Sequence, residues 1–282
     1  MAALKRRSSF AALACVVSSL WASGGVAQEL TPRAYWPAPV GTRVAVVGYN
    51  RSTGDVITDP SLPVVGVDSK INLGLFAYVH YLSLFGRTSN IQVEVPYSWG
   101  TTEGDLEGDA TRRDFSGLAD IGVTLSVNLM GAPAMTPEDF QELRRNPHQL
   151  LGASIRVLAP TGDYDPTKLI NIGANRWAVK GELGYILPIE PRWLLEFELG
   201  GSIIGDNDDF FGVTREQAPI VTGEFHLVRR FKPGFWASFD INYYTGGRST
   251  LDGVEVADLQ RNSRLGGTVV VPFRLRHAVK LG

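Results

Sequence analysis

The stretch that decides the fold is FWASFDINYY, residues 235–244, in which apolar and polar side chains alternate. Its apolar positions are Phe235, Ala237, Phe239, Ile241 and Tyr243, and the polar positions between them include Ser238, Asp240 and Asn242. Successive side chains of a β-strand point to opposite faces of the sheet, so strict alternation predicts a strand with one apolar and one polar face. A soluble sandwich shows the same alternation, so this stretch indicates a sheet but not what surrounds it.

The same alternation recurs along most of the chain. Strands are predicted near residues 41–50, 69–84, 88–99, 117–130, 150–160, 176–188, 192–204, 218–231, 234–245 and 262–273. Most of these segments are about 10 to 14 residues long, whereas strands of globular proteins cluster at about 5 to 6. A tilted strand that crosses a membrane needs about 9 to 11 residues. Strand length therefore favours a membrane barrel.

The connectors alternate between long and short. Long ones are predicted at 51–68, 100–116, 161–175, 205–217 and 246–261, and short ones at 85–87, 189–191, 232–233 and 274–276. Long loops on one side and tight turns on the other are typical of an antiparallel outer-membrane barrel whose N-terminus is periplasmic. The connector 131–149 breaks the rhythm. Its Thr136-Pro137 pair is typical of a helix start, so we expect a short periplasmic helix at about 137–145.

The first 27 residues have the pattern of a secretory signal peptide. A basic segment at residues 5–7 precedes an apolar centre at 10–21, and small residues at 25–27 suit a cleavage site. We therefore expect residues 1–27 to be removed and residues 28–282 to form the barrel domain. The one cysteine in the chain, Cys15, excludes a disulfide scaffold. A formal net charge of −2 gives no general attraction to nucleic acid, so no nucleic-acid partner is predicted.

Aromatic side chains are frequent near the predicted strand ends. Those expected to form girdles at the two membrane interfaces are Trp99, Trp177, Trp193, Phe231, Trp236 and Tyr244. The polar face of the strands is rich in Glu, Asp, Asn, Ser, Thr and Gly, as expected for the lumen of a barrel. Both features fit a membrane barrel, although ordinary core aromatics would give part of the same pattern.

Several loop and strand-entry motifs resemble one known family. They are Pro39-Val40-Gly41-Thr42, Gly117-Leu118-Ala119-Asp120-Ile121, Ala159-Pro160-Thr161-Gly162-Asp163-Tyr164-Asp165, Asn171-Ile172-Gly173-Ala174-Asn175-Arg176-Trp177, Asp206-Asn207-Asp208-Asp209-Phe210-Phe211 and Tyr243-Tyr244-Thr245-Gly246-Gly247. With them the chain resembles Gram-negative outer-membrane proteins named for the meta-pathway of phenol degradation. The resemblance implies a barrel that carries small hydrophobic or aromatic compounds across the outer membrane.

The C-terminus departs from that family. The chain ends at Leu281-Gly282 within an apparent eleventh strand that begins at His277, and it lacks a final strand with a terminal aromatic residue. Closed single-chain barrels usually have an even number of strands. We therefore expect an architecture of about twelve strands, with the end of strand 11 and all of strand 12 missing from this chain. Without them, an open edge is expected between the first and eleventh strands.

The polar faces supply candidates for the lumen and the solute path. They are Gln92, Glu94, Arg156, Lys180, Glu182, Glu196, Glu198, Glu224, His226, Arg230, Asp240 and Asn242. Both charge signs occur on neighbouring strands. One interpretation is a polar constriction that selects solutes by charge and size. The other is a network of ion pairs that fills and stiffens a narrow barrel.

Enzymatic function is not predicted. No nucleophile motif such as Gly-x-Ser-x-Gly is present, and no His pair has metal-ligand spacing, so catalytic residues, cofactors and metal ions are all absent from the prediction. The predicted function is an outer-membrane channel for small, hydrophobic or aromatic compounds. The alternatives are a structural or loop-binding barrel without transport and a soluble exported β protein. The expected partners are outer-membrane lipid and lipopolysaccharide, small hydrophobic solutes and the barrel-assembly machinery.

Overall fold

The computed structural model describes residues 11–16, 31–54, 64–106, 109–168, 171–274 and 277–282. The protein is almost entirely β-structure. Its strands are β1 (Ala11–Val16), β2 (Arg43–Gly54), β3 (Val64–Leu84), β4 (Arg87–Leu106), β5 (Asp109–Leu118), β6 (Ile121–Met130), β7 (Leu150–Ala159), β8 (Ala178–Glu190), β9 (Trp193–Ile204), β10 (Asn207–Phe210), β11 (Val213–Gln217), β12 (Ile220–Lys232), β13 (Phe235–Gly246), β14 (Ser249–Leu251), β15 (Val254–Glu255), β16 (Gln260–Arg274) and β17 (His277–Leu281).

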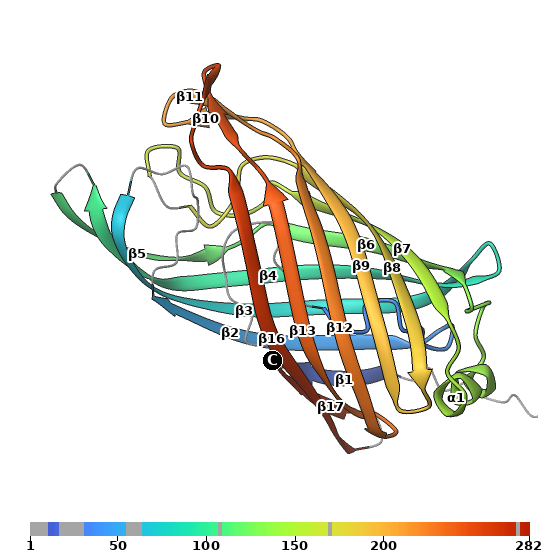
Figure 1. The fold of residues 1–282 in the computed structure, drawn as a ribbon. Helices are drawn as coiled ribbons and strands as arrows, with labels where there is room; N and C mark the ends of the chain where they lie inside the picture. Colours follow the sequence, from blue (N-terminus) through green and yellow to red (C-terminus); the bar gives the residue numbers. More distant parts are fainter. Residues whose placement is uncertain (1–10, 17–30, 55–63, 107–108, 169–170, 275–276) are drawn as a thin grey trace, which may run out of the picture.

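One large sheet curls into a barrel (Figure 1). Its order is β3-β2-β1-β17-β16-β13-β12-β9-β8-β7-β6-β4-β5, and the ring closes because β3 also pairs with β4. Neighbouring strands from β2 through β17 are antiparallel wherever they follow one another in the chain. Pairing around a ring satisfies the backbone polar groups that a sheet edge would leave free in lipid. This is the antiparallel barrel that the strand periodicity predicts.

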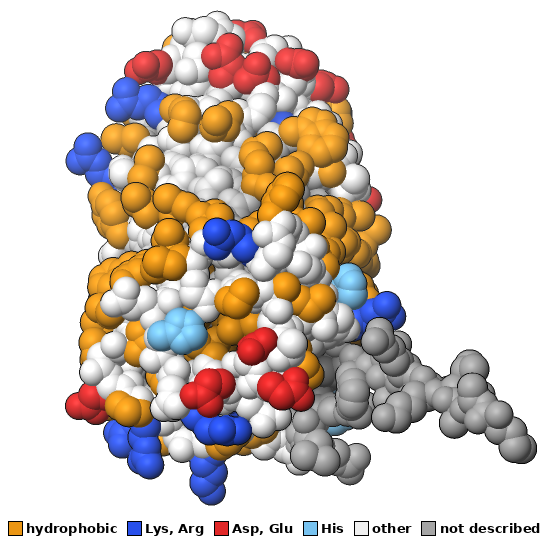
Figure 2. All heavy atoms as spheres, turned by 90° about the vertical axis from the view of Figure 1, so that its right-hand side faces the viewer, with side chains coloured by type: hydrophobic (Ala, Val, Ile, Leu, Met, Phe, Trp, Pro, Cys, Tyr) orange, Lys and Arg blue, Asp and Glu red, His pale blue; other side chains and the backbone are white. Residues whose placement is uncertain are grey.

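The barrel has its apolar side chains outside and many polar side chains inside. Large hydrophobic residues such as Leu199, Phe197 and Val221 are exposed, whereas the intervening Glu198 and Thr222 are buried. Figure 2 shows hydrophobic side chains across the middle of one face, with acidic side chains gathered at the end that carries β10 and β11 in Figure 1. An apolar outer band between charged ends is the surface that a bilayer stabilises.

Four of the predicted long loops contain strands, so those loop predictions are wrong. In 51–68, β2 continues to Gly54 and β3 begins at Val64. Within 100–116, β4 continues to Leu106 and pairs with β5. Polar pairs join these strands: Arg112 forms an ion pair with Glu103 at 2.5 Å, and Thr101 donates a hydrogen bond to Asp114 at 2.5 Å. Because polar residues occupy both faces here, the apolar alternation that reveals a strand is missing from the sequence.

The other two loops, 205–217 and 246–261, contain hairpins of a second sheet with the order β10-β11-β14-β15. The turn of the first hairpin has positive φ at Phe211 and Gly212, and the turn of the second has positive φ at Asp252 and Gly253. Two consecutive residues with positive φ are the requirement of the tight turn that suits a two-residue hairpin. This small sheet stands at the end of the barrel opposite helix α1.

The place between β2 and β17 is taken by β1, which runs parallel to both strands. The open edge expected there is therefore occupied, and by residues of the predicted signal peptide. Of residues 1–27, Ala11–Val16 is the described part, and the rest of that prediction lies outside the described residues. Removal of the signal peptide, and a further strand after residue 282, both stay predictions.

Helix α1 (Pro137–Arg145) lies where the sequence predicts a helix. The Thr136 side chain accepts a hydrogen bond from the backbone of Asp139, and the Asp139 carboxylate accepts one from the backbone of Thr136. This capping box satisfies two N–H groups that a helix start leaves free. The backbone N–H and the hydroxyl of Thr136 both donate hydrogen bonds to the Asp139 carboxylate and hold its pKa below the usual value. No helix in the described part of the chain is long and apolar enough to cross a membrane.

Candidate functional site

A belt of polar side chains lines the lumen on β8, β9, β12, β13 and β16. Strand register sets its order, because residues paired across antiparallel strands lie side by side on the same face. Glu224 of β12 is paired with Glu198 of β9 and with Asn242 of β13. Two residues along, His226 is paired with Glu196 and Asp240. These six side chains form two adjacent rows and are buried.

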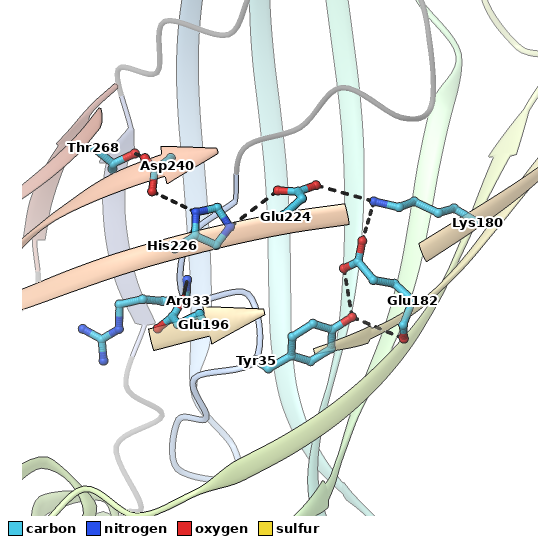
Figure 3. A network of polar contacts seen from close by, with 9 residues as sticks. All are labelled: Arg33, Tyr35, Lys180, Glu182, Glu196, Glu224, His226, Asp240 and Thr268. Atoms are coloured by element: carbon cyan, nitrogen blue, oxygen red, sulfur yellow. Dashed lines mark hydrogen bonds and ion pairs between the residues drawn. The ribbon is translucent and has the colours of Figure 1, made fainter. Parts of the chain in front are cut away.

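His226 is held between two carboxylates (Figure 3). Its Nδ1 lies 2.8 Å from Asp240 Oδ1, and its Nε2 lies 3.5 Å from Glu224 Oε2. Thr268 of β16 donates a hydrogen bond of 2.8 Å to the other oxygen of Asp240. These contacts therefore link three neighbouring strands, β12, β13 and β16, on the inner face of the wall. The ring of His226 has one orientation in this arrangement, with Nε2 directed toward Glu224.

Lys180 and Glu182 continue the belt on β8. Lys180 Nζ lies 2.5 Å from Glu182 Oε2 and 4.0 Å from Glu224 Oε1. On the neighbouring strand β7, Arg156 is the register partner of Lys180 and forms an ion pair of 2.5 Å with Glu94 of β4. Gln92 donates a hydrogen bond to the same carboxylate. Because β6 separates β4 from β7, the Glu94–Arg156 pair reaches over β6, and the burial of Glu94 places the pair on the inner face.

A turn of the N-terminal segment, Thr31–Trp36, fills the lumen beside the belt. The Tyr35 hydroxyl donates to Glu182 Oε1 at 3.0 Å (Figure 3). It also lies 2.8 Å from Ser154 Oγ. Its ring covers Gly152 and Gly184, which are paired in register on β7 and β8. Any side chain at either glycine would collide with the Tyr35 ring. The two glycines therefore form the seat of this aromatic ring.

Polar contacts to the backbone fix the same turn. Asn128 donates a hydrogen bond of 2.9 Å to the Tyr35 carbonyl, and the Arg33 N–H donates one of 2.6 Å to Glu196 Oε2. Next to them is an apolar cluster that joins the turn to the strands and to α1. Its buried members are Tyr35, Trp36, Ala132, Met135, Leu143, Leu150, Ile186, Leu194, Val228 and Trp236. We call Thr31–Trp36 together with this cluster the plug.

A cavity of about 430 Å³ opens at the α1 end, beside the plug. Its lining includes six cationic residues: Arg33, Arg144, Arg145, Arg192, Arg230 and Lys232. Arg33 stacks on the Trp36 ring at 4.2 Å, and Arg230 donates hydrogen bonds to the carbonyls of Pro191 and Arg144. Burial lowers the pKa of Arg33 to about 10, against the opposing effect of Glu196, and the like charges of Arg230 and Arg144 lower it further. This mouth of the lumen is therefore strongly positive.

The structure places the twelve lumen candidates on the inner side of the wall, buried or half-buried. Eleven belong to the belt or to the Glu94–Arg156 group, and Arg230 lies at the cationic mouth. Their part in a solute path stays a prediction. The aromatic girdle is only partly right: Trp99, Trp177 and Phe231 are exposed, but Trp236 and Tyr244 are buried inside.

The plug is the feature that sequence reasoning missed. Arg33, Tyr35 and Trp36 precede the first predicted strand and show no periodicity. The signal that was available is the pair of inward-facing glycines, Gly152 and Gly184, which leave space in the lumen. Only the register of β7 and β8 brings the two together.

Comparisons with known proteins agree with this geometry. A sequence model of the family described as "Putative MetA-pathway of phenol degradation" matches residues 50–279. Among solved structures, an outer membrane channel from Pseudomonas putida F1 is similar, with a TM-score of 0.69 and 23% sequence identity. The match covers 88% of this chain and 88% of that chain. At this identity the likeness concerns the fold. No curated protein matches the chain.

Proposed function

The chain belongs to the family described as "Putative MetA-pathway of phenol degradation", and on that premise we propose that it is an outer-membrane channel for small hydrophobic or aromatic compounds. The channel is passive and non-enzymatic. Residues 1–27 direct export and are removed, and the barrel-assembly machinery inserts the barrel. The α1 end is periplasmic, and the acidic end with β10 and β11 faces the lipopolysaccharide.

The observation that carries this proposal is the division of the lumen into a belt and a plug. A barrel whose interior served only stability could be filled by side chains of its own strands. Here a separate segment, Thr31–Trp36, supplies the filling. It is seated on two glycines and rests against buried carboxylates. A segment that is not part of the wall can move without unfolding the wall, as the gating loops of other proteins do.

The belt gives the solute path through the lumen its selectivity. Many of its charges are paired with one another, and this reduces what an ion that enters the lumen gains from them. A neutral aromatic solute can stack on rings of the plug and donate hydrogen bonds to the belt carboxylates. At the mouth, Arg33, Arg144 and Arg230 favour solutes that carry a negative charge.

Uptake into proteoliposomes tests the proposal. Reconstituted protein should speed the entry of phenol or benzoate above that of empty vesicles. A disaccharide, which is more polar and has a larger cross-section, should enter no faster than it enters empty vesicles. A folded barrel, recognised by its heat-dependent migration on a gel, that passes neither aromatic solute would contradict a channel. The loop-binding barrel would then be the better account.

A further inference from the structure

Three belt side chains bring metal-ligand atoms together. They are Glu198 of β9 and Glu224 and His226 of β12, and their ligand atoms all lie within 4.8 Å of one another. Glu198 and Glu224 are register partners on neighbouring strands, and His226 follows two residues later on the same face. The three therefore point to one spot on the lumen wall. No His pair is involved, so ligand spacing within the sequence gave no sign of this cluster.

The cluster is not satisfied by the protein alone. His226 is 0% exposed and Glu224 is 6% exposed, and neither His226 Nε2 nor Glu224 Oε2 has a hydrogen-bond partner in the described part of the chain; the two atoms face each other at 3.5 Å. Glu198 is 6% exposed and lies beside the negative charges of Glu182 and Glu224. Buried carboxylates that lie close to one another are costly, because they have lost water and repel each other.

The orientation of His226 is that of a ligand. Its Nδ1 faces Asp240 at 2.8 Å, and Asp240 is itself held by Thr268. A carboxylate on one ring nitrogen fixes the tautomer that leaves the other nitrogen as a lone-pair donor. Metal-binding histidines almost always have such a partner. Here the donor atom, Nε2, faces Glu224 and Glu198.

The cluster lies in an acidic part of the belt. Four carboxylates meet here: those of Glu182, Glu198, Glu224 and Asp240. Among the described residues, Lys180 lies 4.0 Å from Glu224, and Arg264 interacts with Glu224 electrostatically. A divalent cation bound among these carboxylates would be attracted by their negative charge.

From these contacts we propose that Glu198, Glu224 and His226 bind a divalent transition-metal ion of the Zn²⁺ type, with Asp240 as a positioning residue. Zinc binds imidazole nitrogen and carboxylate oxygen at about 2.0–2.2 Å, which places tetrahedral ligand atoms about 3.3–3.5 Å apart. The 3.5 Å between His226 Nε2 and Glu224 Oε2 already has that value. Rotation of the Glu198 carboxylate completes the set. The fourth position faces the lumen, where water or a solute can occupy it.

The test is metal binding by the purified, folded barrel in detergent. After equilibration with Zn²⁺ and removal of loosely held ions, elemental analysis should find about one zinc per chain. Co²⁺ in its place should give the visible absorption of a tetrahedral site. Glu198→Gln and His226→Gln should abolish both signals. Asp240→Asn should weaken binding about 10- to 100-fold.

Glu196→Gln is the matched control. It removes a buried carboxylate two residues from Glu198 on the same face, outside the three ligands, and should keep the zinc. Heat-dependent gel migration confirms that each variant is folded. Absence of bound zinc in the folded wild-type protein would overturn the proposal, as would equal binding by Glu198→Gln. Protons would then neutralise the cluster. Solute uptake is not part of this test, so its result is independent of the channel proposal.

Discussion

The belt and the plug lie next to each other on the same strands but have opposite chemistry. Along β9, Glu196 is in the belt and Leu194 is in the plug; along β12, His226 is in the belt and Val228 in the plug. One step of two residues, about 6.6 Å, separates them. The belt ties strands of the wall to one another, whereas the plug ties a separate turn to the wall. A seal made of apolar contacts and a few hydrogen bonds can therefore be released while the ion pairs of the belt keep the barrel's shape.

Breaking an ion pair of the belt should have the largest effect on stability. Arg156→Met removes the cation that pairs with Glu94 and leaves a buried carboxylate with the amide of Gln92, which should lower the free energy of unfolding by about 3–5 kcal/mol. Replacing both residues, as in Glu94→Leu with Arg156→Met, should be close to neutral, because no buried charge remains. Denaturant unfolding of the two single variants and the double variant measures this coupling. Additive losses would show that the belt contributes by packing alone.

Opening a cavity in the plug should have a somewhat smaller effect. Leu194 is fully buried in the apolar cluster, so Leu194→Ala should cost about 2–5 kcal/mol of unfolding free energy. Leu199→Ala on the same strand is the control, because Leu199 is exposed on the outer face. Both variants can be compared by thermal unfolding in detergent. If the two variants were equally stable, the cluster would not be a packed seal.

The sequence predicts the wall well and the filling poorly. The period-two pattern determines which face of each strand is polar, so the positions of Glu198, His226 and Asp240 could be predicted as inward from single strands. Their mutual contacts could not, because these depend on the register between β9, β12 and β13. The plug could not be predicted from the sequence for the same reason. Tyr35 fits the lumen only because two distant glycines, Gly152 and Gly184, become neighbours in the closed sheet.

The ends of the strands were the other feature that the sequence pattern did not predict. Polar residues on both faces of β4 and β5 remove the alternation, so the hairpin around Leu106 reads as a loop. The short strands β10, β11, β14 and β15 are too brief for periodicity to show. Their turns at Phe211-Gly212 and Asp252-Gly253 carry the useful signal, because Gly tolerates positive φ.

The central claim is that Thr31–Trp36 closes a path through the barrel. Single-channel recording of the open probability of Gly184→Val tests it most directly. The new side chain would collide with the Tyr35 ring, and such overpacking costs about 1–3 kcal/mol. That cost should raise the ratio of molecules in which Thr31–Trp36 is displaced to those in which it is in place about 5- to 150-fold. Gly181→Val, on the same strand with open space around it, is the control. Our account predicts more frequent or longer openings for Gly184→Val than for wild type and Gly181→Val. An equal open probability of all three folded proteins would contradict it.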